Sequence, residues 1–152
     1  MQETESIYIA DANLSELQIF QKMECLSDTG KFIIPYSLSK HTEEYSKEEV
    51  IYKKIVNRKN NIIGFVILVL NKNEDCMEFR RIVIEEKGKG YGTDSVKLLD
   101  KLCKDEYGVQ KIWLDVFEFN KRGQHIYEKC GYKYVKSVEL EGETLKIYEK
   151  AL

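Results

Sequence analysis

The chain has 152 residues, the size of one ordinary domain, and it can bury enough apolar surface to fold without a metal or a disulfide. Its 24 Lys and Arg against 26 Asp and Glu give a net charge of −2, which argues against a dedicated nucleic-acid binder. With 43% hydrophobic and 33% charged residues, the composition is that of a folded globular protein rather than a disordered one.

Nothing in the sequence predicts a membrane or metal association. The longest apolar run, 62–70, is too short to cross a bilayer as a helix, and the acidic start of the chain lacks the features of a signal peptide. The four cysteines are widely spaced and form no Cys-x-x-Cys pair, so we expect neither a zinc site nor a disulfide framework. We therefore expect reduced thiols and a cytoplasmic protein.

The first half of the chain predicts a strand, a helix, an irregular stretch and three more strands. Residues 6–10 have the composition of a strand, and apolar residues at helical spacing predict a helix after it. The least regular stretch, 27–46, holds a short helix or a loop over a site. Three β-rich segments separated by polar turns then predict a meander, with strands over 50–56, 62–70 and 77–84.

The second half begins with a glycine-rich turn that leads into an amphipathic helix. A strand over 112–119 follows, and a second helix ends at Gly131, a residue type that favours the left-handed position after a helix. Residues 132–140 and 144–149 predict a final hairpin. The edge strand of such a hairpin would allow a homodimer.

The order of these elements indicates the fold class. A strand, a helix and a strand in succession between Met77 and Phe119 require a crossover, so these two strands should start parallel while the others run antiparallel. The sequence therefore predicts one α/β domain over residues 1–152. Its sheet of six to seven strands should be mostly antiparallel, with one splayed parallel pair and helices on both faces.

One segment of this pattern indicates chemistry: an apolar strand enters a turn with glycines at 88, 90 and 92, and a helix leaves it. Glycine lacks a Cβ, so backbone N–H groups can face one concavity, and the helix start adds its own N–H groups. These features favour a pyrophosphate site, with a plain turn as the alternative. The spacing fits neither the P-loop nor the Rossmann pattern, and Asp115 lies mid-strand rather than at a ribose position.

The same residues resemble the GNAT superfamily of acyl-CoA-dependent N-acetyltransferases. Its phosphate motif [QR]-x-x-G-x-[GA] is matched at both glycines by KGKGYG over 87–92, where Lys87 replaces the usual Gln or Arg. A second block, from Asn120 to Tyr132, resembles N-x-R-A-x-x-x-Y-x-K-x-G-[FY], with Gly123 in place of Ala. The resemblance implies acetyl-CoA as cosubstrate and no metal.

The resemblance also implies which residues bind the cosubstrate. The strand before the glycine turn would pair its backbone with the pantetheine arm and polarise the thioester carbonyl, and the turn would hold the pyrophosphate. Each of these residues also has a purely structural interpretation, as core strand, turn or helix cap. The residues concerned are Ile82, Val83, Ile84, Lys87, Gly88, Lys89, Gly90, Tyr91, Gly92, Thr93 and Asn120.

Two further residues are catalytic candidates by the same resemblance. Tyr127 matches the tyrosine that protonates the departing CoA thiolate, and its alternative role is a core aromatic. Glu78 is the candidate base that deprotonates the acceptor amine; its alternatives are a surface ion pair, or a water relay in its place. His41 and His125 titrate in a useful range but have weaker claims.

The implied function is transfer of acetyl from acetyl-CoA to a primary amine by direct attack in a ternary complex. The acceptor would be a small-molecule amine or a peptide N-terminus, and acidic runs over 43–49 and 139–143 would attract a cation. Cys130 lies near Tyr127, so an acyl-enzyme route stays open. The alternatives are a non-catalytic acyl-CoA-binding sensor or interaction module of the same fold, and a nucleotide-binding regulator.

Overall fold

The computed structural model describes residues 2–3, 6–26, 33–85 and 90–152, and its strands form one sheet in the order β1-β2-β3-β4-β5-β6-β8-β7. The strands are β1 (Gln2–Glu3), β2 (Ile7–Asp11), β3 (Val50–Asn57), β4 (Ile62–Asn71), β5 (Cys76–Ile84), β6 (Lys111–Phe117), β7 (Lys133–Leu140) and β8 (Glu143–Ala151). A 3₁₀ turn, η1 (Leu14–Glu16), precedes the helices α1 (Leu17–Glu24), α3 (Leu38–Tyr45), α4 (Tyr91–Tyr107) and α5 (Lys121–Lys129).

The sheet has the predicted mixed topology. Among the described strands, β5 and β6 form the one parallel pair, and the other neighbours are antiparallel. The sheet of six to seven strands is confirmed, with the two-residue β1 as an eighth strand at its edge. The irregular stretch contains α3, which begins where the Ser37 side chain accepts a hydrogen bond from the Lys40 N–H.

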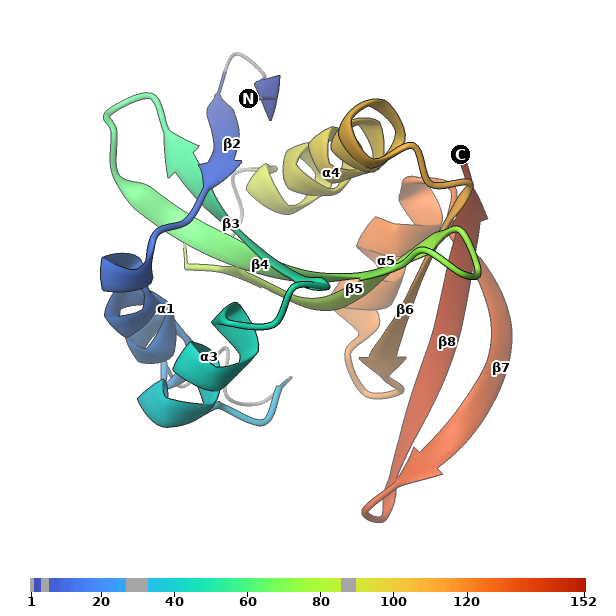
Figure 1. The fold of residues 1–152 in the computed structure, drawn as a ribbon. Coiled ribbons are helices and arrows are strands. Elements are labelled where there is room, and N and C mark those ends of the chain that lie inside the picture. Colours follow the sequence, from blue (N-terminus) through green and yellow to red (C-terminus); the bar gives the residue numbers. More distant parts are fainter. Residues whose placement is uncertain (1, 4–5, 27–32, 86–89) are drawn as a thin grey trace.

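Helices cover both faces of the sheet (Figure 1). On one face, α4 and α5 pack over a core that contains Phe79, Leu99, Leu114 and Tyr127. On the other face, α1 packs with α3 over a second core around Phe20 and neighbouring residues of β3 and β4. We call these the α4/α5 face and the α1/α3 face. None of the helices in the described ranges is long and apolar enough to span a membrane.

A β-bulge in β5 determines which of its side chains reach the α1/α3 face. Ile67 pairs with Arg81 and the next residue of β4, Leu68, pairs with Phe79, so Arg80 has no partner in the ladder. A bulge places two consecutive residues against one on the neighbouring strand. Arg80 and Arg81 consequently both contact helices of the α1/α3 face, through Glu44 of α3 and Glu24 of α1.

The parallel pairing of β5 with β6 stops just before this bulge. The pairs run from Cys76↔Lys111 to Phe79↔Leu114, while β5 continues to Ile84 alongside β4 and β6 continues to Phe117 alongside β8. We call residues 80–84 of β5 and 115–117 of β6 the splayed segment. Its existence confirms the predicted splay of the parallel pair.

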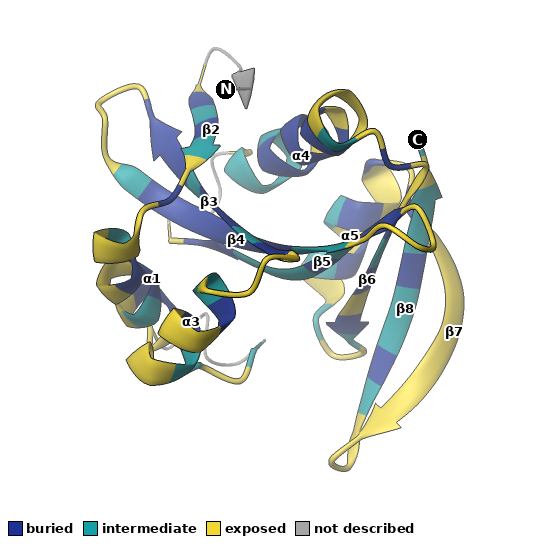
Figure 2. Ribbon diagram, in the orientation of Figure 1, coloured by how far each residue is buried: buried dark blue, intermediate teal, exposed yellow. Residues whose placement is uncertain are grey.

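The C-terminal half matches the prediction closely, with a shift of boundary at the end of β6. The second helix ends before Gly131, whose φ of +94° is the left-handed conformation expected there. Strand β6 ends at Phe117 rather than 119 because the chain turns there, with the Asn120 N–H bonded to the Phe117 carbonyl. Every residue of β7 is exposed (Figure 2), and a homodimer through this edge stays a prediction.

Gly64 allows β4 to approach the splayed part of β5, and its replacement is the first testable prediction. A Cβ at this position would overlap the Val83 carbonyl oxygen, which belongs to the backbone and cannot rotate away. We expect Gly64→Ala to lower the free energy of unfolding by about 1–3 kcal/mol, although Gly→Ala at a compatible site stabilises by about 0.4–1 kcal/mol. Urea unfolding followed by circular dichroism measures the change.

Gly123→Ala is the matched control for this prediction. Its Cβ would meet the amide group of the Asn120 side chain rather than backbone, and moving that group costs at most the helix cap it makes, about 1 kcal/mol. We therefore expect a smaller loss than for Gly64→Ala. Equal losses in the two variants would contradict the close approach of β4 and β5.

Candidate functional site

In the splayed segment, every second residue of β5 points its backbone N–H and C=O groups away from β4, toward the side where β6 has separated. The Glu85 N–H donates to the Ile63 carbonyl, and the Val83 carbonyl lies against Gly64, so the backbone groups of these odd-numbered residues point to β4. Successive residues of a strand point their N–H and C=O groups in opposite directions. The N–H and C=O of Ile82 and Ile84 therefore point away from β4, toward the side that β6 has left, whereas those of Val83 do not.

The N-terminus of α4 follows this strand closely in space. Gly90 begins the helix with a φ of +75°, which glycine adopts readily, and no side chain caps the N–H groups of the first turn within the described residues. Gly92 lies where a Cβ would come within 3.1 Å of the Ile126 side chain, so its lack of a side chain lets α4 pack closely on α5. Lys87, Gly88 and Lys89 of the predicted phosphate turn lie outside the described residues.

Tyr127 lies on α5, in the same core cluster as Ile84 and Val116 of the splayed segment. Its ring is buried and packs edge-on against Tyr132, with 5.8 Å between the ring centroids. Burial, with smaller contributions from Asp115 and Cys130, raises the pKa of the Tyr127 phenol. Because its pKa is raised, the hydroxyl keeps its proton at neutral pH. It donates that proton to no acceptor within the described part of the chain.

Asn120 caps α5. Its side-chain oxygen accepts a hydrogen bond of 2.9 Å from the Gly123 N–H, which is the structural role expected of asparagine at a helix start. The side-chain amide nitrogen takes no part in this bond. Within the described part of the chain, the cap therefore leaves both N–H donors of the Asn120 amide without a hydrogen bond at the same end of β6.

Glu78, the predicted base, is ion-paired. The Arg80 guanidinium donates to both of its carboxylate oxygens, at 3.2 and 3.3 Å, and also to Glu44 of α3 at 2.9 Å. Glu44 in addition pairs with Lys47 and, at 3.8 Å, with Lys40. Glu78 thus lies on the α1/α3 face as part of a charge network that includes the bulge residue.

A second network on the same face is centred on the buried Glu24. Its carboxylate accepts hydrogen bonds of 2.5 Å from His41 Nε2 and from Arg81, and His41 Nδ1 lies 2.7 Å from the Tyr52 hydroxyl. The Arg81 guanidinium also stacks 3.9 Å above the Tyr36 ring. His41 is therefore a bonded core histidine, whereas His125 is exposed on α5.

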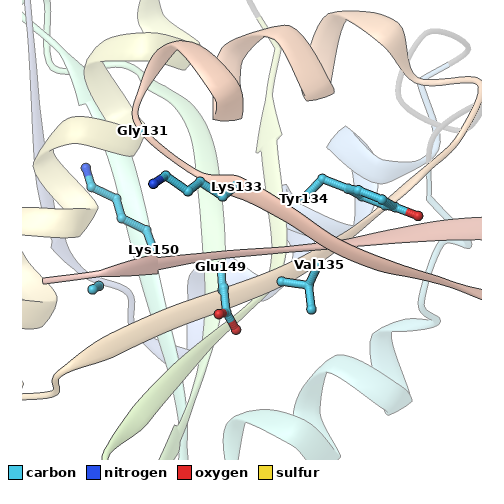
Figure 3. Close-up of a pocket in the computed structure, with 7 residues that line it drawn as sticks. Gly131, Lys133, Tyr134, Val135, Glu149 and Lys150 are labelled. Atoms are coloured by element: carbon cyan, nitrogen blue, oxygen red, sulfur yellow. The ribbon is translucent and has the colours of Figure 1, made fainter.

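Neither the Cys130 thiol nor the surface hollow at β7 and β8 is suited to this chemistry. Burial raises the pKa of the Cys130 thiol, which disfavours the thiolate that an acyl-enzyme would need. Figure 3 shows a hollow at the start of β7 and the end of β8, where the Lys150 ammonium is already bound to Asp100 and to the Cys130 carbonyl. The described residues contain no group of three side chains suited to a metal ion.

Sequence reasoning missed the acidic and basic groups that the α1/α3 face brings together. The strand pattern of Ile112, Leu114 and Val116 implied that the residues between them face the other side, but it did not reveal what lies there. Arg80, Arg81 and Asp115 share that side with Glu78. The bulge has no local sequence signal, so the position of Arg80 could not be predicted.

Comparison with known proteins identifies the class to which this fold and site belong. The model of the Acetyltransferase (GNAT) family matches residues 17–132, and the chain belongs to that family. It is therefore an acetyltransferase that uses acetyl-CoA and an amine acceptor.

The sequence identity to individual relatives is low. The chain is 27% identical over 115 residues to the spermine/spermidine N(1)-acetyltransferase of Bacillus subtilis, covering 70% of this chain and 76% of that protein. The spermidine N-acetyltransferase of Vibrio cholerae in complex with CoA and spermine has the same fold, with a TM-score of 0.85, 19% identity and coverage of 97% and 96%. A domain from Methanocaldococcus jannaschii gives a TM-score of 0.80 at 28% identity, with coverage of 97% and 99%.

Replacing Asn120 tests its structural role. We expect Asn120→Ala to lower the free energy of unfolding by about 1 kcal/mol because the Gly123 N–H loses its cap. Asn120→Asp, which retains an accepting oxygen, should keep most of that stability. Urea unfolding of the two variants measures the cap, and equal stabilities of Asn120→Ala and the unaltered protein would contradict it.

Proposed function

We propose that this protein transfers the acetyl group of acetyl-CoA to a primary amine of a polyamine by direct attack in a ternary complex. The single observation that carries the proposal is the splayed segment, where β5 keeps unpaired backbone groups beside the N-terminus of α4 and above Tyr127. We propose residues 1–152 as one N-acetyltransferase domain, since the described strands all join one sheet.

The cosubstrate is proposed to lie along β5. The outward-pointing groups of Ile82 and Ile84 would pair with the pantetheine arm, and the Ile82 N–H is the donor best directed toward the thioester carbonyl. Val83 would then contribute its side chain to the core rather than its backbone to the ligand. The N–H groups of Gly90, Tyr91, Gly92 and Thr93, which no described side chain caps, would bind the pyrophosphate, with Lys87, Gly88 and Lys89 as further parts of the site.

Tyr127 is proposed as the acid that protonates the departing thiolate. It holds its proton at neutral pH, and its hydroxyl has no competing acceptor among the described residues. Glu78 remains a candidate base, although Arg80 occupies both of its carboxylate oxygens. The Asn120 amide nitrogen, which donates to no described residue, would contact the cosubstrate.

A polyamine is the acceptor that the charges favour over a peptide N-terminus. Acidic residues gather on α3 and at the hairpin tip, where Glu139, Glu141 and Glu143 are exposed. Figure 1 shows that hairpin extending beyond the end of β6. A surface with several carboxylates attracts a molecule with several ammonium groups more strongly than one with a single charge. The Bacillus relative is named for spermine and spermidine, which agrees with this choice.

A panel of acceptors tests the proposed function. With acetyl-CoA and a thiol-release readout, we expect turnover with spermidine and spermine and a kcat/KM at least tenfold lower with a peptide N-terminus, because the peptide brings fewer cationic groups to the acidic surface. No thiol release with any amine, together with stabilisation by acetyl-CoA, would instead favour a non-catalytic sensor. Stabilisation by ATP or NAD alone would favour a nucleotide-binding regulator.

Replacing Tyr127 tests the acid. We expect Tyr127→Phe to lower kcat by about 10²-fold or more while the Kd for CoA stays unchanged, because only the proton donor is removed. Steady-state kinetics and calorimetric titration with CoA measure the two effects. Tyr134→Phe, on the exposed strand β7, is the matched control and should retain full activity. An unchanged kcat in Tyr127→Phe would show that another group protonates the thiolate.

A further inference from the structure

Asp115 lies where the two strands of the parallel pair part. It follows Leu114, the last residue of β6 that pairs with β5. Leu114 and Val116 are both buried in the core of the α4/α5 face. Because side chains alternate along a strand, Asp115 between them points to the α1/α3 face, the side opposite Tyr127.

The other carboxylates of this region are occupied. Glu78 and Glu44 share the Arg80 guanidinium, and Glu24 binds His41 and Arg81. Asp115, in contrast, makes no hydrogen bond or ion pair within the described part of the chain. Its side chain is exposed. Three charged groups act on Asp115, namely Glu78, Arg80 and Arg81, and each of them is paired with another side chain. The Asp115 carboxylate, which has no partner among the described residues, is available to an incoming cation.

The surroundings of Asp115 are those of a group enclosed by protein but reachable by solvent. Desolvation raises the pKa of its carboxyl, Glu78 adds to that rise, and Arg80 and Arg81 oppose it. Although the two side chains lie on opposite faces of the sheet, the charge of Asp115 also contributes to the raised pKa of the Tyr127 phenol. On the β8 side it pairs in register with Ile147, beyond which Lys136 of β7 is the next charged residue.

We propose that Asp115 binds the reacting ammonium group of the acceptor and removes its proton before attack. The geometry carries this assignment: a free carboxylate lies on the α1/α3 face and a phenol on the α4/α5 face, on opposite sides of the splayed segment. The amine would arrive on one side and the thiolate leave on the other. This inference rests on the proposed acetyl transfer and names the base for it.

The proton and electron balance of the reaction follows from these positions. The Asp115 carboxylate takes one proton from R–NH₃⁺, and the freed nitrogen lone pair forms a bond to the thioester carbon. The C–S bond then breaks with its electron pair on sulfur, and the thiolate takes the Tyr127 proton. The nitrogen, still carrying two hydrogens, returns one of them to the phenolate through water, and Asp115 releases its proton to solvent. The products are the N-acetyl amine, CoASH and one proton.

The test compares Asp115→Asn with Glu78→Gln across pH. At pH 7 we expect Asp115→Asn to lower kcat/KM for spermidine by about 10²-fold or more, the range for loss of a general base, with an unchanged Kd for CoA. The kcat/KM of Asp115→Asn should then rise about tenfold per pH unit, because only the unprotonated amine reacts. Its loss relative to the unaltered protein should therefore become smaller toward pH 9.5. Glu78→Gln should lose less than tenfold and keep the pH profile of the unaltered protein.

Two further variants make the outcome decisive. Asp105→Asn, an exposed aspartate of α4, is the matched control and should leave kcat/KM unchanged. Asp115→Glu keeps a carboxylate, so it should retain the pH profile of the unaltered protein. If Asp115→Asn lost activity through a structural defect, Asp115→Glu would not be expected to recover it. Asp115→Glu also serves as the test if Asp115→Asn does not fold.

The possible failures are separable. Failure of the unaltered protein to acetylate any amine would overturn the proposed function itself. If it does acetylate spermidine, then an Asp115→Asn profile parallel to that of the unaltered protein overturns only the role of Asp115. The role of Asp115 would also be overturned if Asp115→Glu changed the pH profile, or if Glu78→Gln lost more kcat/KM than Asp115→Asn.

Discussion

The four residue pairs that join β5 to β6 are the constraint on which the site depends. Beyond them β5 stays bonded to β4, and β6 stays bonded to β8 over its whole length. In the splayed segment, β5 is thus hydrogen-bonded to β4 and β6 to β8, but β5 and β6 are not paired with each other. Unpaired backbone groups inside a protein need a partner, so Ile82 and Ile84 are positioned to satisfy their N–H and C=O groups with an extended ligand.

The bulge at Arg80 and its ion pairs keep β5 in this position. The Glu24 carboxylate is fully buried, and removing one partner of a buried ion pair costs about 3–5 kcal/mol because the remaining charge cannot be solvated. Arg81 cannot therefore leave Glu24, nor α1 leave β5, without a large loss. His41 and Tyr52 extend the network to α3 and β3, so the helices of the α1/α3 face are bonded to β5.

The two faces of the sheet divide the chemistry. The face with α4 and α5 supplies a helix N-terminus and a protonated phenol, which suit a pyrophosphate and a departing thiolate. The face with α1 and α3 carries Asp115, the one carboxylate of this region without a partner among the described residues, which would suit a cationic amine. The reacting atoms would meet between them, at the one place where the sheet is open.

Periodicity and turn chemistry in the sequence determined the order of elements, the parallel pair and the end of α5 at Gly131, because these depend on residues close together in the chain. The glycine turn and the block around Tyr127 indicated the family for the same reason. Tertiary structure alone decided that Arg80 is bulged, that His41 is a bonded core residue and that Glu78 is paired while Asp115 has no partner among the described residues. These features depend on contacts between residues far apart in sequence, such as Glu24 with Arg81 and Arg80 with Glu44, and no local pattern encodes which distant charge will be neutralised.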